Sequence, residues 1–224
     1  MEILQITPEQ AQAFLESEVA AREVDPSFLQ TPAWAQVKAG WQSKVIGFFE
    51  AKELVGTALV LARKMPKLNR YFLYIPEGPA IAAKHLERAI PLLREYAISQ
   101  NGFALRVGPM VVKNRWNSET IKEALADESK KSLPQVTPTW INPDANAIEN
   151  ILRVNGFKPS VDDVNGFAAG QPKYIYQLSL AEKSEADVLE GFNQLWRRNI
   201  KKGEKESNKD FLKLLLAEFD RVKM

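Results

Sequence analysis

The chain contains no cysteine and only one histidine, which limits the chemistry it can perform. Without cysteine there are no disulfides, no thiolate metal sites and no thiol nucleophile. A catalytic triad built on His85 is disfavoured, because this residue sits among charged neighbours at a predicted helix start, where we expect a solvated surface side chain. No Cys/His ligand pairs occur, and we interpret Asp162-Asp163 as a turn rather than a cation site. No metal is therefore expected.

Long apolar runs and glycine-rich loops are also missing. No window approaches the ~18–20 apolar residues that cross a bilayer, and the N-terminus has no secretory signal pattern. We therefore expect a soluble cytoplasmic protein, with contact to the inner face of the plasma membrane left open. The glycines occur singly, so neither a Walker loop nor a dinucleotide fingerprint is present and no cofactor is expected.

Charge and length are ordinary for a globular protein. The 224 residues include 30 basic and 28 acidic side chains, a net charge of +2. This balance argues against a dedicated nucleic-acid coat, although local clusters can still bind anions. The length suits one large domain or two small ones, and 45% apolar residues suffice for a core without staples.

The pattern of apolar residues predicts a mixed α/β chain, in which a meander of adjacent strands is followed by helices and one further strand. Thr7 and Ser118 are predicted helix caps, and residues 103–107 a central strand. The predicted strands cover residues 1–6, 44–51, 53–63, 70–76, 103–107 and 174–180. The predicted helices cover residues 8–18, 33–39, 84–100, 118–130, 146–154, 184–206 and 209–222.

A basic cluster stands out near the C-terminus. Residues 195–202 (LWRRNIKK) contain four cations, and on a helix Arg198 and Lys202 share one face. The cluster is consistent with a solvated basic face or with an anion site, and both interpretations stay open. Lys38, four residues after Trp34, allows the same two interpretations: its stem covers the indole, or its ammonium binds an anion.

Three stretches together resemble the Fem family of peptidoglycan bridge-forming aminoacyltransferases. Residues 28–38 (FLQTPAWAQVK) are similar to the family's opening motif. Residues 55–66 followed by 71–79 (YFLYIPEGP) look like its strand, basic turn and strand. Residues 193–206, with LWRRNIKKGEKE at the centre, resemble its RRNI helix. The three occur in family order over residues 28–206.

The resemblance implies a fold and a reaction. The fold would be a GNAT-like acyltransferase domain with a mixed, largely antiparallel sheet flanked by helices. The reaction would move an amino acid from aminoacyl-tRNA to an amine of the peptide stem of a peptidoglycan precursor, in cell-wall bridge formation. The acceptor would be UDP-MurNAc-pentapeptide or lipid II. Such a transfer needs positioning and oxyanion stabilisation more than a strong acid or base.

The resemblance also implies site residues. Lys38 and Arg198, with Arg197 beside it, match family positions that contact the precursor's pyrophosphate, and Tyr74 would line the same cleft. Catalytic residues are not assigned, because many members have an acidic residue where this chain has Gly108.

The resemblance predicts a domain division as well. Residues 1–182 would form the N-terminal domain, and residues 183–224 a helical segment that begins a second, missing half. A partner chain could supply that half.

Three functions stay open at this point. The first is the aminoacyltransferase. The second is an inactive remnant or binding module for a muropeptide or another phosphorylated ligand. The third is an acetyl-CoA-dependent acetyltransferase, which would want a glycine-rich pyrophosphate loop at a helix N-terminus; no such loop is present.

Overall fold

A computed structural model describes residues 1–17, 23–24, 26–159, 167–168, 171–172 and 174–205. The chain divides into two compact units, residues 1–159 and residues 160–224. The domain division expected between residues 182 and 183 stays a prediction.

The first unit is built on a mixed sheet in the order β1-β2-β3-β4-β6. The strands are β1 (Glu2–Gln5), β2 (Gln42–Glu50), β3 (Glu53–Lys64), β4 (Tyr71–Ile75) and β6 (Gly102–Val107). Neighbours are antiparallel except β4 and β6, which run parallel. A short strand β5 (Ala80–Ile81) pairs with β3 on the same side as β4. The predicted fold class, a largely antiparallel mixed sheet flanked by helices, is confirmed.

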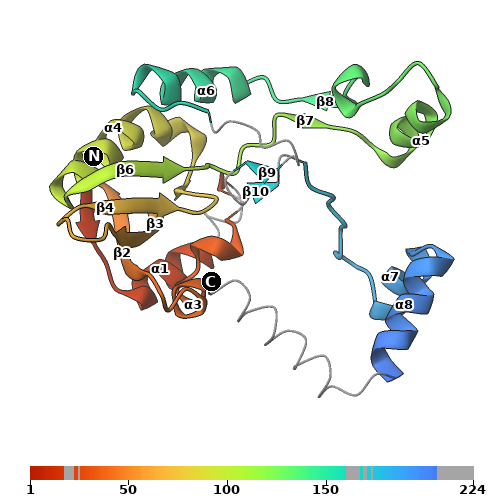
Figure 1. Cartoon of the computed structure of the whole chain (residues 1–224), viewed down its shortest axis with the longest axis horizontal. Coiled ribbons are helices and arrows are strands. Elements are labelled where there is room, and N and C mark those ends of the chain that lie inside the picture. Colours follow the sequence, from red (N-terminus) through yellow and green to blue (C-terminus); the bar gives the residue numbers. More distant parts are fainter. Residues whose placement is uncertain (18–22, 25, 160–166, 169–170, 173, 206–224) are drawn as a thin grey trace. The chain divides into compact units, whose positions relative to one another are not determined.

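Helices cover both faces of this sheet (Figure 1). On one face lie α1 (Pro8–Leu15), the 3-10 turn η1 (Phe28–Gln30) and α3 (Pro32–Val37). On the other lie α4 (Leu86–Ser99), preceded by the 3-10 turn η2 (Ala83–His85), and α6 (Ala145–Val154). An excursion between β6 and α6 contains β7 (Asn114–Arg115), α5 (Ser118–Ala126), η3 (Leu133–Gln135) and β8 (Trp140–Ile141), with β7 and β8 paired.

The core follows from the alternation of side chains along β3. Ala58 and Val60 face α4 and pack in one buried cluster with Phe48, Leu73 and other residues of that face. Leu59 and Leu61 face α1 and α3 in a second cluster. A strand covered on both faces is apolar on both, as residues 58–61 (ALVL) in the buried middle of β3 are.

Local signals in the sequence account for several element ends. Thr7 caps α1, as predicted, and Gln10 completes a capping box with it. At the end of α4 the left-handed residue is Asn101, with φ of 56°, rather than the glycine that follows it. The cap of α5 is Asn117, not the predicted Ser118, because the Asn117 side chain accepts the N–H of Thr120.

Two further expectations for the first unit are wrong. Residues 103–107 were expected to form a central strand, but β6 is the last strand in the order and pairs only with β4 among the described strands. Leu105 and Val107 of β6 pack against the core cluster on the α4 face, whereas Phe103 is 51% exposed. His85 is not a solvated surface residue. Its side chain is only 12% exposed, and Nδ1 lies 3.3 Å from Oε1 of Glu50.

The second unit contains the short strands β9 (Phe167–Ala168) and β10 (Gln171–Pro172), followed by α7 (Glu185–Gly191) and α8 (Gln194–Lys205). The predicted helix 184–206 is therefore two helices. The break follows Gly191, and the Asn193 side chain caps the new helix by accepting the N–H of Trp196.

The strand predicted at residues 174–180 does not form, because this segment pairs with no described strand. Alternation alone cannot supply the partner that a strand needs. Asp162-Asp163 and the helix predicted at 209–222 lie outside the described residues. In the part of the chain that is described, no helix combines the length and apolar character required to traverse a bilayer.

Candidate functional site

The first candidate site lies where the two parallel strands end. β4 and β6 run in the same direction, so their carboxyl ends reach the same edge of the sheet. Beyond them, the N–H of Gly108 donates to the carbonyl of Gly78 over 3.2 Å, which keeps the two departing segments together. Ligands of sheets with parallel strands commonly bind at this kind of edge.

Gln30 fixes the shape of this edge. Its side chain is 1% exposed. Its amide donates to the carbonyl of Pro76 and accepts the N–H of Leu59 over 3.1 Å. Because β4 and β5 leave β3 unpaired between them, the side chain supplies the hydrogen bonds that a strand would otherwise make. The stretch FLQTP is thereby joined to the stretch YIPEGP.

Gly78 is required by this contact. A Cβ added at Gly78 would lie 2.4 Å from Cδ of Gln30, closer than real Cβ atoms approach a neighbour. Gly78 and Pro79 are joined by a cis peptide bond. At Gly108, by contrast, an added Cβ meets no atom within 4 Å, so the structure accommodates a side chain there.

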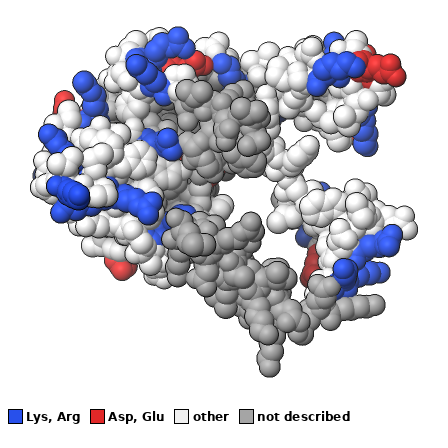
Figure 2. Space-filling model, viewed as in Figure 1, with Lys and Arg blue, Asp and Glu red and all other residues white. Residues whose placement is uncertain are grey.

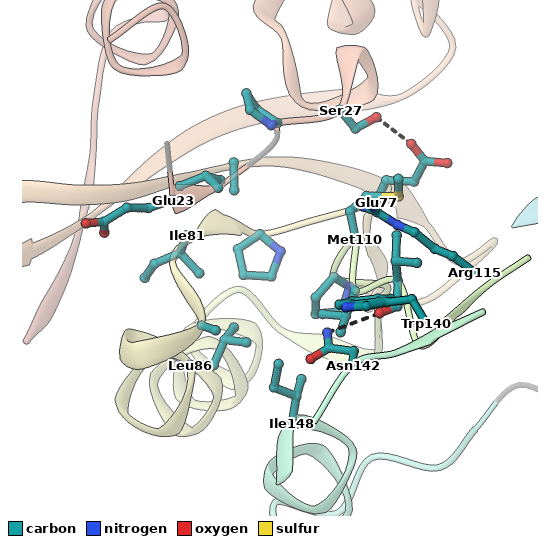
Figure 3. Close-up of a pocket in the computed structure, with 18 residues that line it drawn as sticks. Glu23, Ser27, Glu77, Ile81, Leu86, Met110, Arg115, Trp140, Asn142 and Ile148 are labelled. Carbon is teal, nitrogen blue, oxygen red and sulfur yellow. Dashed lines mark hydrogen bonds between the residues drawn. The ribbon is translucent and has the colours of Figure 1, made fainter. Parts of the chain in front are cut away.

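Glu77, in this turn, is one of the residues that line a pocket, and its carboxylate points to Ser27 (Figure 3). Its φ of 46° is left-handed, a conformation that costs a residue other than glycine free energy and is commonly found at functional sites. The hydroxyl of Ser27 donates to Oε2 of Glu77 and also accepts the N–H of Leu29 over 3.1 Å. The carboxylate is therefore held in place by the segment that leads into η1.

The pocket has a volume of about 270 Å³, smaller than a site for a whole cofactor or nucleotide. Its floor is apolar, formed by Ile81, Leu86 and Ile148. Its lining also includes residues 109–112, which follow β6, and charged or polar side chains at the rim. These rim residues are Glu23, Glu77, Arg115 and Asn142.

The rim carries both signs of charge. A hydrogen bond from the Lys84 ammonium, 2.8 Å away, lowers the pKa of the Glu23 carboxyl, so this group is ionised at neutral pH. The guanidinium of Arg115 lies 5.0 Å from the centroid of the Trp140 ring. Such a pocket suits one apolar group that bears an ammonium or a carboxylate at its end. No cluster of acidic or histidine side chains suited to a metal ion occurs among the described residues.

Two of the predicted site residues, Lys38 and Tyr74, lie on the face of the sheet that α1 and α3 cover. The Lys38 ammonium is 5.0 Å from the centroid of the Trp34 ring. The backbone carbonyl of Lys38 accepts the N–H of Trp41 over 2.8 Å. The Trp41 ring is 6.4 Å from the ring of Tyr74. Lys38 and Tyr74 thus share one surface through Trp41, and neither lines the pocket.

The other two predicted residues lie on α8 in the second unit. Arg197 is engaged there, since its guanidinium donates to the carbonyl of Glu190 over 3.1 Å at the end of α7. Arg198 is exposed on the same helix. Lys38 and Arg198 belong to different units, so a joint site for the two cations stays a prediction.

Sequence reasoning did not single out Gln30, Ser27, Glu77 or Arg115. Gln30 and Glu77 stand inside the two quoted stretches, and a buried amide or a left-handed glutamate has no signature in one sequence. The Gly78-Pro79 pair was the available signal, because it marks a turn directly after a strand.

Comparison with known proteins places the chain. The FemAB family matches residues 6–208. The chain belongs to the FemAB family. The predicted family resemblance is therefore confirmed, and the two stretches joined by Gln30 both lie within the matched region.

Among relatives of this FemAB chain is the lipid II:glycine glycyltransferase of Staphylococcus saprophyticus. It is 26% identical over 212 residues, which cover 90% of this chain and 41% of that protein. The enzyme of the same name from Staphylococcus aureus strain NCTC 8325 is 29% identical over 116 residues, 50% of this chain and 26% of that protein. The crystal structure of FemX matches with a TM-score of 0.56 at 22% identity, over 96% of this chain and 48% of that chain. This last likeness shows the fold, and the chain spans less than half the length of these relatives.

Proposed function

We propose that this chain takes part in transferring an amino acid from aminoacyl-tRNA to the stem peptide of a peptidoglycan precursor. The observation that carries the proposal is the FemAB match over residues 6–208. The relatives' names, lipid II:glycine glycyltransferase, favour a lipid II acceptor, and UDP-MurNAc-pentapeptide has the same stem and pyrophosphate. The same proposal includes a partner chain that supplies the second half and completes the activity.

In this reaction the acceptor amine attacks the ester carbonyl of the charged tRNA. A C–N bond forms, the ester C–O bond breaks, and the ribose oxygen leaves with the proton that the amine gives up. The amine has to be neutral and held in line with the carbonyl. Glu77, fixed by Ser27 at the mouth of an apolar pocket, is suited to hold an amino group that ends an aliphatic side chain.

We further propose that Lys38, Arg198, Arg197 and Tyr74 hold the precursor's pyrophosphate. An ammonium and a guanidinium are the groups that bind phosphate most strongly in proteins. Support comes from the placement of Lys38 beside Trp41 and Tyr74 on one surface, and from the exposed guanidinium of Arg198. Arg197 already donates to Glu190, so Arg198 is the better of the two arginine candidates.

Transfer is tested by incubating the chain with charged tRNA and the lipid-linked or UDP-linked precursor, and measuring the precursor's mass. A product heavier by one residue supports the enzyme. Glu77→Gln keeps an acceptor for Ser27, so it should retain precursor binding and lose transfer. Precursor binding without transfer in the wild-type chain would support the binding module instead, and thermal stabilisation by acetyl-CoA alone would support the acetyltransferase.

The pyrophosphate assignment has a separate test. Lys38→Ala and Arg198→Ala should each weaken binding of UDP-MurNAc-pentapeptide by roughly 1–3 kcal/mol, the scale of hydrogen bonds to charged groups. Lys122→Ala, an exposed lysine on α5, is the matched control and should bind as the wild type does. Unchanged affinity in both test variants would remove the assignment.

A further inference from the structure

The turn between β3 and β4 presents apolar side chains to solvent. The turn is closed by the N–H of Met65, which donates to the carbonyl of Arg70 over 2.8 Å, and Lys67 adopts a left-handed φ of 64°. Met65 is 39% exposed and Leu68 is 54% exposed. The turn therefore holds two large apolar groups outside the core of a well-formed hairpin.

Basic residues flank these two side chains along the chain. Residues 54–76 contain no aspartate or glutamate but include Arg63, Lys64, Lys67 and Arg70. Elsewhere in the first unit Lys84, Arg88, Lys113 and Arg153 pair with carboxylates. Lys64, Lys67 and Arg70 form no ion pair with any other described residue. Like charges this close repel one another, so a polyanionic partner would stabilise the turn.

The strands beside the turn also present apolar and basic side chains. Lys64 pairs with Tyr71 and Tyr71 with Gly102, so the turn lies beside the start of β6. Phe103 there is 51% exposed, and its ring centroid lies 6.4 Å from that of Phe72. The Arg106 guanidinium lies 5.5 Å from the same Phe72 ring. Figure 2 shows lysine and arginine side chains gathered at this end of the sheet, over the starts of β4 and β6.

We propose that the β3–β4 turn docks this chain on an anionic bilayer surface. Met65 and Leu68 enter the boundary between headgroups and acyl chains, while Lys64, Lys67 and Arg70 contact lipid phosphates. This combination of exposed aliphatic groups with a basic surround is what an anionic interface stabilises. A nucleic acid would also attract the cations, but it would leave the two aliphatic side chains at the turn without an apolar environment.

The proposal goes beyond the transfer reaction and does not depend on it, because docking is measured without donor or acceptor. Two aliphatic groups and three cations give weak binding, which should fall steeply as salt screens the charges. Docking would bring the chain to a surface where lipid-linked acceptors lie, which is the use we infer for it.

Sedimentation with vesicles tests the docking. The full chain should bind vesicles of phosphatidylcholine mixed with phosphatidylglycerol and bind pure phosphatidylcholine vesicles much less. Removing two cations in Lys64→Gln/Lys67→Gln should weaken binding by roughly tenfold to thirtyfold, since each basic residue near such a surface contributes a factor of about five. The control Lys130→Gln/Lys131→Gln makes the same charge change at two exposed lysines after α5 and should bind normally.

Insertion of the apolar groups has its own readout, because the chain has no cysteine of its own. Leu68→Cys, labelled with an environment-sensitive fluorophore, should shift its emission to the blue on mixed vesicles and be quenched by lipid-borne quenchers. Leu125→Cys, at a leucine 82% exposed on α5, is the control and should show neither change.

Three results would overturn the proposal. The first is unaltered vesicle binding in Lys64→Gln/Lys67→Gln, which would move any membrane contact elsewhere, such as the cations of α8. The second is an equal response of the labels at positions 68 and 125. The third is no vesicle binding by a chain that binds single-stranded RNA and loses this binding in the double variant, which would make the turn a nucleic-acid surface.

Discussion

Gln30→Met tests the arrangement at the end of β4 most directly. Methionine has nearly the same length and fills the same volume, but it can neither donate to Pro76 nor accept from Leu59. Both backbone groups are then buried without a partner, and each unpaired group costs about 1–3 kcal/mol, so the loss of stability lies between about 2 and 6 kcal/mol. We expect the lower half of this range, because the new side chain leaves no cavity.

The measurement combines urea denaturation with amide hydrogen exchange. The Leu59 N–H faces the gap between β4 and β5, so its exchange should accelerate in Gln30→Met more than that of Val60 on the same strand. Gln36→Met is the matched control, since Gln36 is exposed on α3, and it should change stability by less than about 0.5 kcal/mol. If Gln30→Met also stays within that margin and leaves Leu59 exchange unaltered, the hydrogen bonds of Gln30 do not hold the turn.

Three further predictions concern the same unit. Gly78→Ala drives a Cβ into the Gln30 side chain, so it should lower stability by at least about 1–3 kcal/mol and weaken precursor binding in a titration. Hydrogen bonds from Lys113 and Arg153 hold the pKa of Glu149 below its ordinary value, so this carboxylate stabilises the fold above the unfolded Glu pKa and stops doing so as pH falls through the lower folded pKa. Glu149→Gln should therefore lower the free energy of unfolding at neutral pH and leave it equal to that of the wild type in acid. A stability difference that persists in acid would contradict this. Asn117→Ala removes the cap of α5 and should cost about 1 kcal/mol in thermal unfolding, with no effect on vesicle binding.

Some of the candidate site is visible in the sequence and some is not. The stretches around Gln30 and Glu77 are recognisable by their resemblance to the family's motifs. Nothing in either stretch indicates that the Gln30 side chain bonds the backbone of the other stretch, at Pro76. The pocket is built from segments that start as far apart as Glu23 and Ile148. Such a site forms only where segments distant in the sequence pack together, and a local sequence pattern does not predict that packing.

The errors in the fold have the same origin. Residues 174–180 alternate like a strand, but a strand requires a neighbour, and no described segment pairs with them. β6 was expected at the centre of the sheet, but it pairs only with β4 among the described strands and none of its residues is fully buried. The break after Gly191 depends on Asn193, whose side chain competes for the backbone N–H that a continuous helix would use.

The sequence by itself determined the local structure. This includes the cap at Thr7, the strand β3, the basic β3–β4 turn without aspartate or glutamate, and the stretches shared with the FemAB family. These depend on residues close together along the chain, where propensity and periodicity act. The tertiary structure alone decided that Gln30 occupies the gap between β4 and β5, that Glu77 lines a pocket, and that Tyr74 lies beside the Trp41 ring. Those relations are set by packing between distant segments, and packing is a property of the folded chain.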